Sequence, residues 1–142
     1  MGHQNLMADS ALELKASAAV TSSAAGSLIL DLGEGYTEGL IYVDVTAIDI
    51  ASNDEIFDIV PQLSPDAAFG TAGNIVDLPG LNLSAKEVKR TDCDRDDTTG
   101  EYVIPFNNML NGTKYRYLRL YTVVAGTTPS ITYSARATWR AA

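Results

Sequence analysis

The 142-residue chain has a single cysteine, Cys93, and a single histidine, His3. One thiol excludes an intrachain disulfide, and together with one imidazole it leaves too few ligands for a zinc site made of protein groups alone. A general base needs a fixed, dry position. His3 is the third residue of the sequence, where such a position is not expected, so histidine-dependent hydrolysis is disfavoured. Carboxylates beside Cys93 disfavour the reactive thiolate, so we interpret it as an incidental surface cysteine.

Long hydrophobic runs are also missing. The first ten residues lack the cationic start of a secretory signal, and the Ala/Ser/Thr-rich stretch 16–30 is too short and polar to cross a bilayer. We therefore expect no membrane partner and a protein that stays in a reducing cytosol or in a particle assembled there.

Positive charge is scarce, since 18 acidic and 10 basic residues give a net charge of −8. An acidic chain repels phosphate backbones, so nucleic acid is not an expected partner. Residues 1–113 carry a net charge of −13, whereas residues 114–142 carry five cations and no carboxylate side chain. If these regions form different surfaces, the molecule is electrically two-sided, which suits an acidic partner or self-association. Cations on ordinary outward strand positions are the alternative.

Alternation of apolar and polar residues dominates the sequence, and helical periodicity is scarce. The pattern predicts strands over 12–17, 27–32, 40–50, 55–60, 74–78, 101–106, 115–124 and 130–140. Proline bars a central strand from continuing, so the fourth is expected to end before Pro61. We predict one all-β domain over 1–142, an antiparallel two-sheet β-sandwich or a barrel. Residues 1–10 are expected to form a flexible arm and 82–100 an acidic loop insertion; spacing alone does not choose between jelly-roll and immunoglobulin-like topologies.

The last two predicted strands alternate so regularly that they are expected to form a hairpin through residues 126–129. On that arrangement a stripe of interface-type side chains lies on one surface: Tyr117, Arg119, Tyr121, Arg136 and Arg140. Tyrosine and arginine are enriched at protein interfaces because they bury area while keeping their polar tips satisfied. Two alternatives stay open. The tyrosines could be ordinary sheet-face residues under loops, or the stripe could face inward, where Arg119 would need a buried carboxylate.

One acidic segment has calcium-loop spacing. Asp92, Asp94 and Asp96 match its opening, but the sixth position holds Asp97 rather than glycine and the twelfth holds Val103 rather than glutamate. The EF-hand match fails, which leaves a looser oxygen-ligand site or a solvated loop. No pair stands out among the carboxylates of 44–58, and no glycine loop of phosphate-binding type is present. We therefore expect no catalytic residues and no cofactor.

The order of several segments carries a family resemblance. They are Leu-Glu-Leu (12–14), the Ala/Ser/Thr-rich run, Leu-Asp-Leu-Gly (30–33), Leu-Ile-Tyr-Val-Asp-Val (40–45), Val-Pro-Gln-Leu-Ser-Pro-Asp-Ala-Ala-Phe (60–69) and Lys-Tyr-Arg-Tyr-Leu-Arg-Leu-Tyr (114–121). After the last come Val123, Gly126 and a final alternating strand. Over about half its length the chain thus resembles the capsid cement, or decoration, proteins of tailed bacteriophages. Residues 82–100 have no counterpart in it.

The resemblance implies a jelly-roll β-sandwich, often a homodimer, on the outside of an icosahedral shell. There it would bind the major capsid protein and clamp neighbouring subunits against the pressure of the packaged genome. It implies a structural virion protein of the capsid exterior, assembled in the host cytoplasm, and no enzyme. Two other hypotheses remain open. One is a carbohydrate-binding module, either lectin-like or part of a phage adsorption apparatus, with Tyr117, Tyr121 or Trp139 stacking on sugars; the other is a hydrolase using paired carboxylates.

Overall fold

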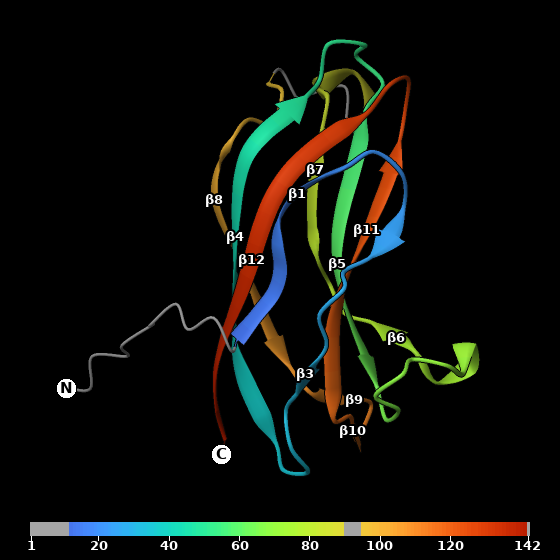
Figure 1. Ribbon diagram of the computed structural model, residues 1–142, viewed down its shortest axis with the longest axis vertical. Helices are drawn as coiled ribbons and strands as arrows, with labels where there is room; N and C mark the ends of the chain where they lie inside the picture. Colours follow the sequence, from blue (N-terminus) through green and yellow to red (C-terminus); the bar gives the residue numbers. More distant parts are fainter. Residues whose placement is uncertain (1–11, 90–94, 142) are drawn as a thin grey trace, which may run out of the picture.

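The computed structural model describes residues 12–89 and 95–141 as two stacked antiparallel sheets (Figure 1). The first sheet has the order β1 (Glu13–Val20), β12 (Ser130–Ala141), β4 (Thr37–Asp49) and β8 (Gly100–Asn107). In the second sheet, β11 (Tyr117–Ala125) pairs with β5 (Ile56–Ser64) at the centre. Short strands form its edges: β2 (Ala24–Ala25) and β3 (Leu30–Asp31) beside β11, and β6 (Val76–Asp77) and β7 (Leu81–Ser84) beside β5. The all-β sandwich prediction is confirmed.

The connections between the sheets are those of a jelly roll. With β2 and β3 taken as one interrupted strand, and β6 and β7 as another, the chain changes sheet at every step except the one after β5. Between β8 and β11 it forms a small ribbon of β9 (Met109–Leu110) and β10 (Thr113–Lys114) at one end of the sandwich. This pairing order decides the choice of topology that strand spacing had left open.

The core lies between the sheets, because every second side chain of a strand points toward the opposite sheet. In β4 the inward residues are Ile41, Val43 and Val45, all almost fully buried, as their spacing predicts. The same spacing predicts Ala47 on this face, but Ala47 is exposed, beyond a register irregularity opposite Thr132 and Tyr133. Against them pack the inward residues of β11 and β12, including Leu118, Leu120, Ile131, Tyr133, Ala135 and Ala137. Each large side chain that is fully buried contributes roughly 1.5–3 kcal/mol relative to exposure.

β5 does not stop before Pro61 but runs through it to Ser64, so that expectation is wrong. In an antiparallel strand the N–H and C=O of one residue point to the same neighbour. The carbonyl of Pro61 accepts a hydrogen bond from the N–H of Leu78, which lies in the gap between β6 and β7. The N–H that proline lacks therefore faces an interruption in the ladder, where the missing donor costs little.

Other boundaries differ from the predicted ones. Of the strand expected over 27–32 only β3 forms, and β9 and β10 lie between the strands predicted over 101–106 and 115–124, where no strand was expected. The range 82–100 is not one loop, because it includes most of β7, the 3-10 turn Lys86–Val88 and the start of β8. The predicted arm 1–10 lies outside the described residues.

The predicted terminal hairpin is wrong, because β11 and β12 lie in opposite sheets. β11 pairs with β5, β2 and β3, and β12 pairs with β1 and β4. The connection through Gly126 (φ 113°) and Thr128 (φ 49°) crosses from one layer to the other. Alternation shows only that a strand has a buried face; here the two buried faces meet across the core instead of sharing a sheet.

Candidate partner-binding surfaces

The five predicted interface residues are split between the two sheets of the sandwich. Tyr117, Arg119 and Tyr121 point outward from the second sheet, half-buried, while Leu118 and Leu120 between them are fully buried. Arg136 points outward from the first sheet, and Arg140 occupies the register position opposite Glu38, its side chain outside the described part. The stripe is therefore two separate surfaces.

The first surface, called the Arg119 face, comprises Tyr117, Arg119, Tyr121, Val60 and Gln62 on β11 and β5. Arg119 lies opposite Gln62, which in turn lies opposite Asp77 of β6. Nε of Arg119 donates to Oε1 of Gln62 at 2.8 Å, and Nε2 of Gln62 donates to Oδ1 of Asp77 at 2.9 Å. Because the face is external, Arg119 needs no buried carboxylate, and the inward-facing alternative is wrong.

Phe69 completes the Arg119 face from the loop after β5. The guanidinium carbon of Arg119 lies 4.3 Å from the centroid of the Phe69 ring, a cation–π contact. Phe69 is 6% exposed although it belongs to a loop, and its φ is 50°. Positive φ is a true outlier for a bulky residue, so the loop holds this ring at a cost in backbone strain.

Asp66 holds that loop in shape. Its carboxylate accepts hydrogen bonds from the N–H groups of Ala68 and Gly70, and these bonds, that of Ala68 first, lower the pKa of Asp66. Its own N–H donates to Oγ of Ser64. The Ser64-Pro65-Asp66 turn is recognisable in the sequence. Phe69 was missed by sequence reasoning, although it is the one aromatic residue among the small residues that follow this turn.

The second surface, called the Arg136 face, lies on β12, β4 and β8 and comprises Leu40, Tyr42, Val103, Pro105 and Arg136. In register, Arg136 lies opposite Tyr42, which lies opposite Val103; Leu40 lies opposite Pro105. Val103 is 49% exposed, more than any other large aliphatic side chain in the part of the chain that the structure describes. The sequence pattern identified Arg136 but missed the four apolar and aromatic neighbours, because they come from strands far away in the chain.

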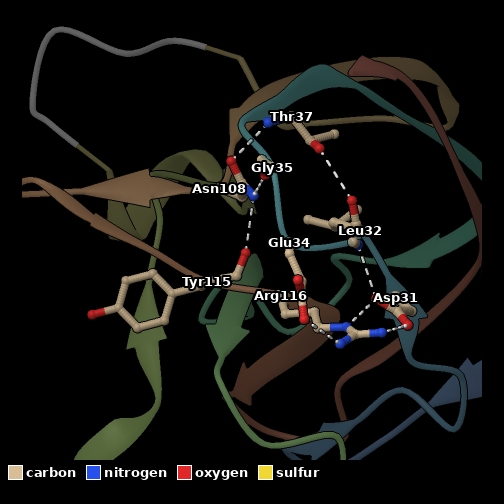
Figure 2. Close-up of polar contacts among 9 residues, drawn as sticks. Asp31, Leu32, Glu34, Gly35, Thr37, Asn108, Tyr115 and Arg116 are labelled. Carbon is tan, nitrogen blue, oxygen red and sulfur yellow. Dashed lines mark hydrogen bonds and ion pairs between the residues drawn. The ribbon is translucent and has the colours of Figure 1, made fainter. Parts of the chain in front are cut away.

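The remaining basic residues do not form a common surface. Arg116 binds both carboxylate oxygens of Asp31, at 2.8 and 2.9 Å, and reaches Glu34 at 3.4 Å (Figure 2). The Arg116 hydrogen bonds hold the pKa of Asp31 at about 2. The cations of residues 114–142 thus occur on both sheets, interleaved with earlier strands, and at least one of them is neutralised internally. The condition for a two-sided charge distribution, that residues 1–113 and 114–142 form different surfaces, is therefore not met.

Beside this ion pair, Asn108 fastens the loop 31–37 to the β9–β10 ribbon (Figure 2). Its Nδ2 donates to the carbonyls of Gly35 and Tyr115, at 2.8 and 3.0 Å, and its Oδ1 accepts from the N–H of Thr37 at 2.8 Å. Asn108 is fully buried. This end of the sandwich is therefore held by a completely hydrogen-bonded side chain.

Several candidate acidic residues have structural contacts. Asp96 accepts a hydrogen bond from the N–H of Lys86, whereas Asp92, Asp94 and Cys93 lie outside the described residues. Fully buried Glu55 accepts from the N–H groups of Ser52 and Asp54 in the turn before β5. Across residues 12–89 and 95–141, no group of three or more His, Cys, Asp or Glu side chains could hold a metal ion.

Trp139, a candidate sugar platform, occupies the inward phase of β12 and packs half-buried against the core, so it does not lie on either outer face.

Comparison with known proteins finds no matching family model and no matching curated protein. Among the described elements, no helix has the length and apolarity needed to span a bilayer.

Proposed function

We propose that this chain is a structural virion protein that binds the outer surface of a tailed-phage capsid and stabilises the lattice of the major capsid protein. The motif resemblance implies this role together with a jelly roll, and the pairing order of the two sheets is that of a jelly roll. Agreement between the topology and the implied fold supports the proposal.

The observation that carries the proposal is the presence of two interface-type surfaces on opposite sides of one sandwich. The Arg119 face and the Arg136 face belong to different sheets, whose buried sides are packed together. A protein that reinforces a lattice must hold two neighbours at once, and it stabilises the assembled state by binding it in preference to its parts. Repetition over a symmetric shell then raises the effective concentration of each contact.

The two faces suit different partners. Homodimer interfaces are more apolar than other interfaces, and the Arg136 face has exposed Val103 and Pro105 beside Leu40. We assign this face to the homodimer that the resemblance implies. The more polar Arg119 face then points away from the dimer on each side and contacts the major capsid protein.

Purified particles of the phage that encodes the chain test the proposal. Mass spectrometry of intact virions should detect the chain, and cryo-electron microscopy should place its sandwich on the exterior of the shell. Heads lacking the protein should bind it when it is added back, and should then release DNA at a higher temperature. Its absence from purified heads would refute the role.

A dimer-specific variant sharpens the test. Val103→Asp places a charge on the Arg136 face and should convert the dimer to a monomer in analytical ultracentrifugation. Lys114→Asp, which adds negative charge at an exposed position of β10 outside both faces, is the control and should remain dimeric. In a glycan array the wild-type protein should give no specific binding; saturable binding to one sugar class would favour the carbohydrate-binding alternative.

A further inference from the structure

Two nearby arginines, Arg116 just before β11 and Arg119 within it, have very different surroundings. Arg116 is neutralised by the two oxygens of Asp31 and by Glu34. Arg119 forms one hydrogen bond, from Nε to the neutral amide of Gln62, and no carboxylate within the described residues pairs with it. A guanidinium has five N–H donors, so the four on the two terminal nitrogens of Arg119 have no partner in the part of the chain that the structure describes.

The orientation of Arg119 is nevertheless fixed from two sides. Asp77 orients Gln62, Gln62 holds Nε, and the Phe69 ring lies against the guanidinium plane. Phe69 keeps a positive φ to make this contact. Strained backbone persists where the surrounding structure enforces it, and such strain points to function. An arginine held in this way loses less conformational entropy when a ligand binds than a free one does.

We infer that Arg119 is a preorganised receptor for a carboxylate side chain of the protein that docks on the Arg119 face. The planar fork of the guanidinium matches the two oxygens of a carboxylate. The half-buried residues Tyr117 and Tyr121 flank it on the same side of β11. A nucleic-acid phosphate is disfavoured as the occupant because the chain carries a net charge of −8.

For the identity of the docking protein this inference rests on the proposed function, but the chemistry of the site can be tested without a capsid. Side-chain NMR of the wild-type protein would follow the Nε–Hε signals of Arg119 and Arg116 during titration with the tripeptide amide acetyl-Gly-Glu-Gly. The Arg119 signal should shift saturably, at least about fivefold more than with the Gly-Gln-Gly analogue, as expected for a charge-assisted bond. The Arg116 signal should stay in place.

Two results of this titration would overturn the inference: no shift of Arg119, or an equal shift with the glutamine peptide. A stronger response to inorganic phosphate than to the glutamate peptide would also overturn it, because the site would then be a general anion site.

Capsid binding gives the second arm. In co-sedimentation with heads lacking the protein, Arg119→Gln should weaken binding about 10- to 100-fold, as for an interface hot spot. Arg119→Lys keeps the charge but loses the planar guanidinium. Its affinity for heads should lie between those of Arg119→Gln and the wild type. Lys114→Gln removes one cation from an exposed position outside the site and should change binding by less than about twofold.

Melting temperatures of the variants separate docking from folding. If Arg119→Gln binds heads as tightly as wild type but melts at a lower temperature, Arg119 only anchors the Phe69 loop, and the inference is wrong. If wild-type protein fails to bind heads, the proposed function is wrong, while the peptide titration still decides the carboxylate site.

Discussion

The hydroxyl of Thr122 in β11 contacts the hydroxyl of Tyr133 in β12 across the interior of the sandwich. Both residues are almost completely buried, at 2% and 0% exposure. Burial raises the pKa of Tyr133 to about 12. The two strands that the sequence suggested as hairpin partners are therefore joined by a side-chain hydrogen bond between the sheets rather than by a backbone ladder.

This pair predicts a non-additive mutational effect. Thr122→Val keeps the shape of the side chain but leaves the phenol hydroxyl buried without its partner, which should cost about 1–3 kcal/mol of unfolding free energy. Tyr133→Phe should cost about 1 kcal/mol. The double variant should be less destabilised than the sum of the singles, as measured in a urea-unfolding double-mutant cycle. Additive effects would show that the two hydroxyls do not interact.

Asn108 predicts a pH-dependent variant. In Asn108→Asp, one oxygen can still accept from Thr37, but the other faces the carbonyls of Gly35 and Tyr115, to which the amide donates in the wild type. The variant should lose roughly 3 kcal/mol or more at neutral pH, since it buries a charge that faces acceptors.

The sign of the pH effect follows from that burial. The pKa of the new carboxyl should be raised in the folded state, so the destabilisation relative to wild type should shrink as the pH falls through that value. Asn107→Asp is the control, because Asn107 is exposed and its Oδ1 accepts from the N–H of Met109, which a carboxylate can also do. Chemical unfolding at several pH values measures both; equal losses in the two variants would contradict the prediction.

The Asp31–Arg116 pair predicts acid sensitivity. The folded pKa of Asp31 is about 2, below the ordinary value of 3.8. Its stabilisation is therefore complete above the unfolded pKa and is lost as the pH falls through the folded one. Unfolding free energy should decrease below about pH 4, and less steeply in Asp31→Asn.

Arg116→Gln should also make the unfolding free energy less dependent on pH in acid, because the Arg116 hydrogen bonds are the main cause of the lowered pKa of Asp31. High salt should weaken the effect, since both side chains are partly exposed. If the unfolding free energy of both variants depends on pH below about pH 4 as steeply as that of the wild type, the ion pair is not the cause of the acid sensitivity.

Substitution by alanine should affect stability very differently at two glycines. At Gly39 of β4 an added Cβ would lie 1.9 Å from the carbonyl oxygen of Thr138 and 2.8 Å from the Cα of Trp139. Gly39→Ala should therefore displace β12 and cost about 1–3 kcal/mol or more. At Gly35 an added Cβ would meet nothing within 4 Å, so Gly35→Ala should unfold within about 0.5 kcal/mol of wild type. Thermal melts compare them; an intact melting temperature in Gly39→Ala would contradict the close approach.

Features of the fold that depend only on residues adjacent in the sequence were predictable. The strands β4 and β11 followed from alternation, whereas the direction in which the Tyr117–Arg119–Tyr121 stripe faces was settled only by the burial of Leu118 and Leu120. Pro61 failed as a stop signal because its tolerance depends on the gap between β6 and β7, which is a property of the neighbouring chain segments.

The candidate site was predictable only in part. Arg119, Tyr117 and Tyr121 share a strand, so their common face is visible as a period of two. Phe69, Gln62 and Asp77 reach Arg119 from two other segments, and nothing in their own spacing indicates that contact. Arg136 was expected beside Arg119 and lies on the opposite sheet.

By itself the sequence determined that this protein is built of strands, and for several of them which side chains are buried, because period-two alternation is a local property of the chain. Only the tertiary structure decided which strands pair, and with that the jelly-roll order, the two separate outer faces and the surroundings of Arg119. The reason is that pairing is made by backbone donors and acceptors, which are nearly the same in every strand; the choice among them depends on how all the buried faces pack together.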